Sequence, residues 1–165
     1  MIGAAVLAAT LTLTPAGMPA DPPPVKTSKN APSQTGIEPS AYRGKHYRPG
    51  QEPYRKCVAQ REGRGQYWGT GGNGYYLGTY QMSRPLTRGA VWMMTKELRA
   101  VYGDRRGKQI RDRLFDTKPT KWHRFYWDMA FYTVLNWDHA ASGAKHWRGG
   151  RFHCNPSMTY WGGER

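Results

Sequence analysis

One acidic side chain stands out as a candidate for chemistry because of its position in the chain. Glu62 is the only acidic residue between Pro53 and Lys96, and it precedes a Gly-rich, aromatic loop at the end of an expected helix. The negative end of a helix dipole disfavours a carboxylate, and partial burial under aromatic rings adds a desolvation cost. Both effects favour the protonated form that a general acid for glycosidic bonds requires. The alternative is a surface Glu paired with Arg61 or Arg64.

Flat aromatic side chains gather in the loop that follows Glu62. Such rings stack on sugar rings and on bases, although core packing is the alternative reading for at least half of them. Residues 69–74 also spell GxGxxG, but a dinucleotide site needs a strand before these glycines and a helix after them. A helix precedes them here, so no nucleotide site is expected. The aromatic residues are Tyr67, Trp68, Tyr75, Tyr76 and Tyr80.

No metal or organic cofactor is expected. His146, His153 and Cys154 do not have a spacing typical of zinc sites, and no Ser-His-Asp order is legible. Any catalysis would therefore rest on ordinary side chains.

The elements that must position Glu62 are predicted to be mostly helical. An acid and a proline in the first turn start a helix at Glu52, and Gly63 ends it. Glycines and tyrosines predict a loop or short hairpin over 67–81. Further helices are expected over 83–101, over the charged stretch 103–117, and over 120–141, with a short segment at 144–147. The longest of these, 120–141, should turn inward Trp122, Phe125, Met129, Tyr132 and Trp137.

Composition and charge narrow the class of protein. The chain has 165 residues, with 25 Lys and Arg against 11 Asp and Glu, a net charge of +14. This length suggests one domain with tails and is too short for a (β/α)₈ barrel. The 13 % aromatic content excludes a wholly disordered chain. The positive charge indicates a polyanionic partner: nucleic acid, an anionic membrane or an acidic wall polymer.

The N-terminal third divides into two expected segments. Residues 1–20 resemble a secretory signal, with an apolar run and small residues near Ala16 and Ala20, although no basic residue precedes the run. An uncleaved membrane anchor is the alternative. Residues 21–50 are rich in Pro, Ser, Thr and Lys and are expected to form a disordered linker. The folded domain is therefore expected over 51–165, in a secreted or wall-associated protein.

The two cysteines bracket most of the expected domain. In an exported protein, Cys57 and Cys154 predict one disulfide, with Cα atoms about 4.4–6.8 Å apart. The alternative is a pair of buried free thiols.

These residues together carry a resemblance to a known family. The stretch from Cys57 to Gly63, the stretch from Asn73 to Ser83 and the tryptophan at position 92 resemble the resuscitation-promoting-factor-type, transglycosylase-like catalytic domain of actinobacterial wall enzymes. The resemblance implies a compact, lysozyme-like α+β fold, mostly helical. Glu62 would be the catalytic acid, and Trp147 with Cys154 would form a closing element. The sugar-binding residues would be Trp68, Thr70, Asn73, Tyr76 and Gln81.

The resemblance also implies a reaction and partners. Glu62 would protonate the leaving oxygen of the β-1,4 bond between N-acetylmuramic acid and N-acetylglucosamine, followed by water attack or by attack of the sugar's 6-hydroxyl. Asp128 or Asp138 could fold close to Glu62 as a second carboxylate. The expected partners are peptidoglycan glycan strands and anionic wall polymers, not a specific nucleic acid, and the protein is expected to be a monomer. A non-catalytic, basic wall-binding protein is the competing class.

Overall fold

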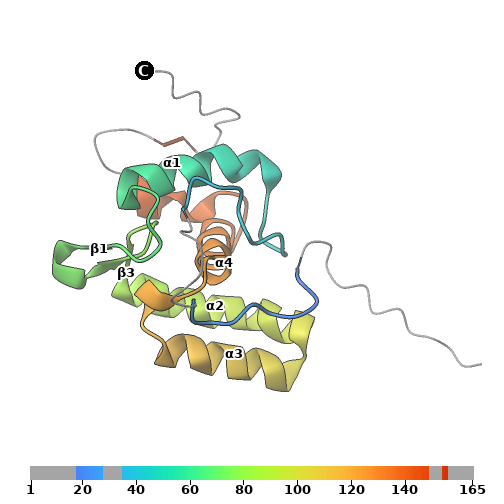
Figure 1. The fold of residues 1–165 in the computed structure, drawn as a ribbon. Helices are drawn as coiled ribbons and strands as arrows, with labels where there is room; N and C mark the ends of the chain where they lie inside the picture. The colour runs from blue at the N-terminus through green and yellow to red at the C-terminus, as the bar shows by residue number, and fades with distance from the viewer. Residues whose placement is uncertain (1–17, 28–34, 149–153, 156–165) are drawn as a thin grey trace, which may run out of the picture.

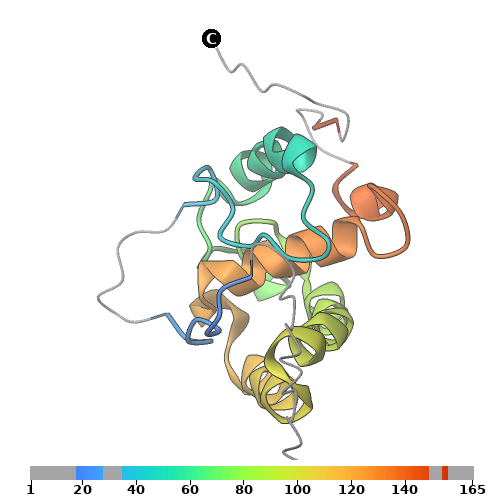
Figure 2. The ribbon, with the colours of Figure 1, turned by 90° about the vertical axis from the view of Figure 1, so that its right-hand side faces the viewer.

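The structure is a computed structural model that describes residues 18–27, 35–148 and 154–155. These residues form a mostly helical domain with one small sheet, which confirms the predicted α+β class. Figures 1 and 2 show three levels. Helix α1 (Glu52–Gly63) lies on one side, α4 (Arg124–Leu135) in the middle, and α2 (Arg84–Tyr102) with α3 (Asp104–Asp116) on the other.

The predicted hairpin is present and forms a three-stranded antiparallel sheet in the order β1-β2-β3. The strands are β1 (Thr70–Gly71), β2 (Tyr76–Leu77) and β3 (Met82–Ser83). Short 3₁₀ turns complete the domain at Pro49–Gln51, Gly72–Gly74, Pro119–Lys121 and Ser142–Trp147.

Helices α1 and α2 follow the local signals that predicted them. Each has a proline in its first turn, where the missing N–H costs nothing. The Ser83 hydroxyl caps α2 by accepting from the Leu86 N–H at 3.3 Å. Gly103, at φ +81°, ends α2 and leads directly into α3.

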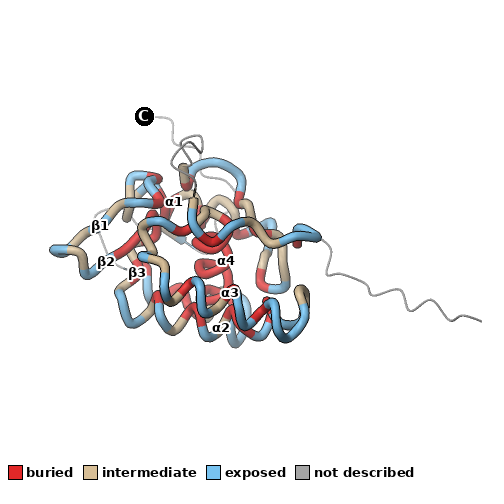
Figure 3. Tube along the Cα trace, turned by 60° about the horizontal axis from the view of Figure 1, so that its bottom comes forward, coloured by how far each residue is buried: buried red, intermediate tan, exposed pale blue. Residues whose placement is uncertain are grey.

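Helix α4 is the centre of the core. Every residue from Phe125 to Leu135 is buried (Figure 3). The helix is shorter than the predicted 120–141 at both ends. It begins at Arg124, after a 3₁₀ turn, where His123 Nδ1 caps it by accepting from the Phe125 N–H at 3.2 Å. It ends at Leu135, where the Asn136 side chain donates to the His46 carbonyl (2.8 Å) and to Gln51 Oε1 (2.6 Å). Trp137 therefore lies outside the helix and is 47 % exposed, so its predicted inward position was wrong. The other four predicted inward residues are buried.

The prediction of a linker over 21–50 needs correction for the parts that the structure describes. Segments 18–27 and 35–50 form no α-helix, as their composition indicates, yet they pack against the domain. The His123 N–H donates to the Val25 carbonyl at 2.8 Å, and the Tyr42 side chain is completely buried. Backbone bonding and aromatic burial hold these segments, so position 51 does not separate a linker from the core. Residues 28–34 lie outside the described residues.

The predicted disulfide is confirmed. Cys57 and Cys154 are bonded, with Cα atoms 5.8 Å apart. The bond links α1 to the end of the described chain. The predicted signal segment lies outside the described residues up to Gly17, and no described helix is long and apolar enough to cross a membrane.

Candidate active site

The end of α1 is fixed in place by close backbone contacts. Arg64, the residue after the helix, has the left-handed conformation at φ +51°. The next residue, Gly65, donates its N–H to the Ala59 carbonyl at 2.9 Å and closes the last turn. A Cβ atom on Gly63 would lie 2.5 Å from the Thr79 Cα. Glycine at this position therefore lets the helix end touch the backbone that returns from the hairpin, and it holds the neighbouring Glu62 beside that hairpin.

Glu62 is paired with Arg61 through one of its two carboxylate oxygens. Its side chain is 29 % exposed. Its Oε1 accepts from Arg61 Nε at 2.9 Å and from Arg61 Nη2 at 2.6 Å. The same Nη2 donates to the Trp147 carbonyl at 2.5 Å. Among the described residues, no hydrogen bond to Glu62 Oε2 is found, so Oε2 is the oxygen from which a proton could pass to a substrate.

The hairpin presents two faces with different candidate residues. The pairs Gly71–Tyr76 and Thr70–Leu77 alternate along β1 and β2, so Tyr76 and Thr70 lie on opposite faces. Gln81 shares the face of Tyr76, because a Cβ atom on Gly71 would lie 2.3 Å from Gln81 Oε1 and 3.9 Å from the Tyr76 Cβ. The structure therefore brings Tyr76 and Gln81 together and places Thr70 on the other side.

The remaining candidates have different surroundings. Asn73 is exposed at the hairpin tip in the left-handed conformation, φ +53°. Trp68 and Tyr76 are exposed, 50 % and 44 %, so both rings are available to a ligand. The Gln81 amide is partly used within the hairpin, where its Nε2 donates to the Gly78 carbonyl at 2.7 Å. Gly78 is at φ +69°, which supplies the bend that Tyr76 and Gln81 need to share a face.

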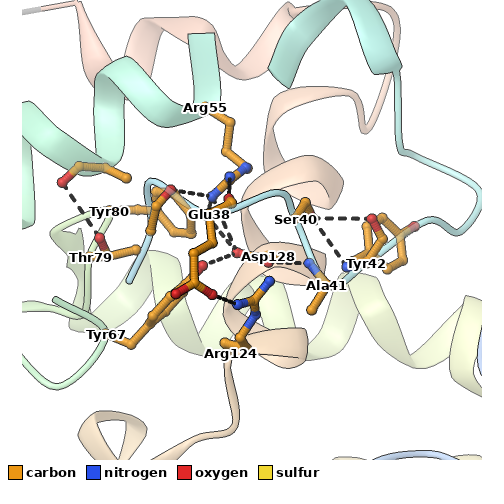
Figure 4. Close-up of polar contacts among 12 residues, drawn as sticks. Glu38, Ser40, Ala41, Tyr42, Arg55, Tyr67, Thr79, Tyr80, Arg124 and Asp128 are labelled. Atoms are coloured by element: carbon orange, nitrogen blue, oxygen red, sulfur yellow. Dashed lines mark hydrogen bonds and ion pairs between the residues drawn. The ribbon is translucent and has the colours of Figure 1, made fainter. Parts of the chain in front are cut away.

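A buried polar cluster fastens the hairpin to the core (Figure 4). Asp128 of α4 accepts from the hydroxyls of Tyr67 and Tyr80, both at 2.6 Å, through Oδ1. Tyr67 and Tyr80 lie before the first strand and before the last strand of the hairpin. The other oxygen of Asp128, Oδ2, accepts from the Ala41 N–H at 2.7 Å. Arg55, completely buried in α1, donates to the Tyr80 hydroxyl at 2.8 Å and lies 3.7 Å from Asp128.

This cluster is structural, because its groups are closed to solvent and used by one another. Burial, with the Asp128 charge adding to it, raises the pKa of the Tyr67 and Tyr80 hydroxyls well above the usual value, so both remain proton donors. Asp128 is therefore not available as a second catalytic carboxylate. Asp138, the other one considered, is 81 % exposed and pairs with His139.

Sequence reasoning missed most of this cluster. It weighed Tyr67 and Tyr80 as stacking rings or core residues without assigning a role to their hydroxyls, and it did not single out Arg55. One signal was legible: Asp128 is the only charged residue within the otherwise apolar and aromatic stretch 125–135. A carboxylate at such a position must find buried partners.

Trp147, expected in the closing element, is buried beside the same hairpin. Its indole Nε1 donates to the Tyr80 carbonyl at 2.9 Å, and its ring packs on Phe131 at 4.7 Å between centroids. The disulfide between Cys57 and Cys154 and the bond from Arg61 to the Trp147 carbonyl both join later residues to α1, the helix that carries Glu62.

The described residues contain no group of three or more His, Cys, Asp or Glu side chains that could hold a metal ion. A cavity of about 490 Å³ lies beside Thr70, and Glu62 is not among its lining residues. A scan against protein-family models and searches of curated proteins and of solved structures found no match to this chain.

Proposed function

We propose that the protein is a glycosidase that cleaves the β-1,4 bond between N-acetylmuramic acid and N-acetylglucosamine in peptidoglycan, with Glu62 as the proton donor. One observation carries this proposal: a partly exposed carboxylate, with one oxygen that no described residue bonds, ends a helix beside a hairpin with exposed aromatic rings. Carboxyl groups perform proton transfer in glycoside cleavage, and aromatic rings provide flat surfaces for sugars.

The reaction can proceed with a single carboxyl group. Protonated Glu62 gives its proton from Oε2 to the glycosidic oxygen as the C–O bond breaks, leaving positive charge on the muramic acid ring. The resulting carboxylate then takes a proton from the incoming nucleophile. If the nucleophile is water, the product is a reducing end, and if it is the 6-hydroxyl of the same sugar, the product is a 1,6-anhydro ring.

A non-catalytic, basic wall-binding protein is the second candidate, and one contact favours it. Arg61 engages Glu62 Oε1 through two N–H groups, and the Arg61 side chain is only 8 % exposed. A carboxylate held in this way can serve as a structural ion pair. Under this alternative, the positive charge of +14 would provide the affinity for anionic wall polymers.

Digestion of purified peptidoglycan by the full chain, followed by mass spectrometry of the soluble products, separates the two candidates. We expect released muropeptides, and the mass of their ends reports hydrolysis or anhydro-ring formation. Glu62→Gln keeps the size of the side chain but removes the transferable proton, so release should fall by about 10²–10⁴-fold.

Glu38→Gln is the matched control, because it removes a carboxylate that pairs with Arg124. We expect it to digest peptidoglycan at the parent rate. Parent-level digestion by Glu62→Gln would remove Glu62 from the mechanism. No digestion by the parent, together with retention on the wall, would support the binding protein instead.

A further inference from the structure

A cavity on the far face of the hairpin belongs to no part of the proposed reaction. It has a volume of about 490 Å³ and lies between the hairpin, the first two turns of α2 and the segment from the end of α3 to Trp122. Four residues of α2 line it at spacings of three and four, so one face of that helix forms a wall. These residues are Arg84, Thr87, Arg88 and Val91.

The interior of the cavity is apolar. Leu77, Val91, Leu114 and Trp122 line it, and all four are buried in the domain. The indole N–H of Trp122 is already used, since Nε1 donates to the Leu114 and Thr117 carbonyls at 3.2 and 3.1 Å. The ring therefore offers the cavity only apolar surface. A volume of this size, with mostly apolar walls, is typical of small-molecule sites.

The rim of the cavity is positively charged. Arg84, Arg88 and Lys118 line it, and among the described residues no acidic side chain does. All three are exposed, and within the described parts of the chain none of them pairs with a carboxylate. The Arg84 Nε donates to the Gly74 carbonyl at 2.8 Å, and Arg88 lies over the Phe115 ring at 5.2 Å. These contacts hold both guanidinium groups at the mouth of the cavity.

We propose that this cavity binds a small organic anion, a carboxylate attached to a compact apolar group. The apolar walls would take the body of the ligand, and the guanidinium groups at the rim would take the carboxylate through charge-assisted hydrogen bonds. Threonine hydroxyls at the walls can accept or donate further bonds. These threonines are Thr70, Thr87, Thr117 and Thr120. The proposal does not depend on the glycosidase activity, because Glu62 is not part of the lining.

Two sources of this chemistry are possible: a free aryl acid and the C-terminus of a short apolar peptide. Titration of the ¹⁵N-labelled full chain with 3-phenylpropionate and with N-acetyl-alanyl-alanine distinguishes them, with the corresponding uncharged amides as controls. We expect saturable shifts at the backbone amides of Thr87, Val91 and Thr117 with at least one acid. That acid should bind about tenfold more tightly than its amide.

Variants test whether the rim provides the specificity. Arg88→Gln should weaken binding of the acid by about tenfold. Arg105→Gln removes the same charge from an exposed position on α3 outside the cavity, and it should change the affinity less than about twofold. Glu62→Gln should leave the affinity unchanged, so failure of the cavity and failure of the glycosidase are separate results.

Three results would overturn the proposal. One is the absence of saturable shifts at these amides with both acids. Another is a failure of the charged rim to provide selectivity. This failure would be seen as equal binding of acid and amide, or as equal loss of affinity in Arg88→Gln and Arg105→Gln. The third is saturation of the same amides by chitotetraose, which would make the cavity a sugar site.

Discussion

Arg61 determines how the carboxylate of Glu62 can be used. Its guanidinium binds Glu62 Oε1 and the Trp147 carbonyl at the same time. The pair is therefore held by the chain's later residues as well as by α1. Both bonds from Arg61 go to Oε1, and among the described residues no hydrogen bond to Oε2 is found. Glu62 can act either as a proton donor or as one half of a structural ion pair with Arg61. Digestion of peptidoglycan by the Glu62→Gln variant distinguishes these two roles.

The exposed ring of Tyr76 is the second residue whose role a single substitution can test. It lies on the hairpin face shared with Gln81 and is 44 % exposed. If it stacks on a sugar ring, Tyr76→Ala should weaken binding of peptidoglycan fragments by about 1–3 kcal/mol, by analogy with stacking on bases. Calorimetric titration gives the affinity, and thermal unfolding of the same sample shows whether the ring also stabilises the loop.

Unchanged affinity in a stably folded Tyr76→Ala protein would mean that this face of the hairpin is not the sugar platform. The ring packs against Tyr75 at 5.0 Å between centroids. A loss of thermal stability together with affinity would assign Tyr76 to support of the loop.

At the scale of elements, the hairpin and α1 act as one unit because Asp128 and Arg55 connect them. The Tyr67 and Tyr80 hydroxyls, at the two ends of the hairpin segment, both donate to Oδ1 of Asp128 in α4. Arg55 adds the connection to α1 through the Tyr80 hydroxyl. A buried network in which each group is satisfied fixes positions strongly, since any broken bond leaves a buried polar group without a partner.

The substitution Tyr80→Phe tests this connection, because it removes only the hydroxyl group that bonds Asp128 and Arg55. The variant leaves Asp128 and Arg55 each short of a bond, so the free energy of unfolding should fall by about 1–3 kcal/mol. Tyr75→Phe is the matched control, since that ring is 47 % exposed, and its effect should be within about 0.5 kcal/mol. Urea unfolding of the two variants measures both values, and equal stabilities would contradict the role assigned to the cluster.

The disulfide connects elements that are far apart in sequence. Cys57 and Cys154 are separated by 97 residues. The entropy lost by the unfolded chain through such a loop corresponds to at most about 4–5 kcal/mol. The double variant Cys57→Ser, Cys154→Ser should therefore have a markedly lower Tm, and added reductant should lower the Tm of the parent but not that of the variant. Equal Tm values for parent and variant would show that the bond contributes little to stability.

At the scale of the whole molecule, positive charge is concentrated in the part of the domain that contains α2 and α3. Residues 84–121, which include α2 and α3, contain 11 Lys and Arg against 4 Asp and Glu, a net of +7, half of the total +14. Figure 1 places α2 and α3 together on the side of α4 opposite α1. A polyanion would therefore be attracted mainly to the surface formed by α2 and α3, away from the end of α1 that carries Glu62.

This distribution predicts salt-sensitive binding to wall polymers. Retention of the full chain on purified wall fragments should decrease steadily as sodium chloride is raised, because salt screens exposed charges beyond about 8–10 Å. The double variant Lys96→Gln, Arg105→Gln should elute at lower salt than the parent, while Glu62→Gln should elute at a salt concentration no lower than the parent. Retention that does not respond to salt would contradict an electrostatic attraction.

Local signals in the sequence determined several features of this protein. Proline in the first turn and glycine at the end set the bounds of α1, and the same kind of signal sets those of α2. The glycines and tyrosines of 67–81 predicted a loop or short hairpin, and a hairpin is present. The two cysteines predicted a disulfide, and the bond is present. These features depend on residues close in sequence, or on a pair with no alternative partner. Pattern alone is sufficient in such cases.

Only the tertiary structure decided the rest, because the deciding contacts join residues far apart in the chain. Asp128 meets Ala41, Tyr67 and Tyr80 across 87, 61 and 48 positions, and no local pattern encodes that convergence. The same is true of Asn136, whose bonds to distant residues end α4 early. Packing of the Pro-rich segments also depends on surfaces that exist only once the helices have assembled. Long-range burial of polar groups, rather than helical period, determined where the hairpin stands relative to Glu62.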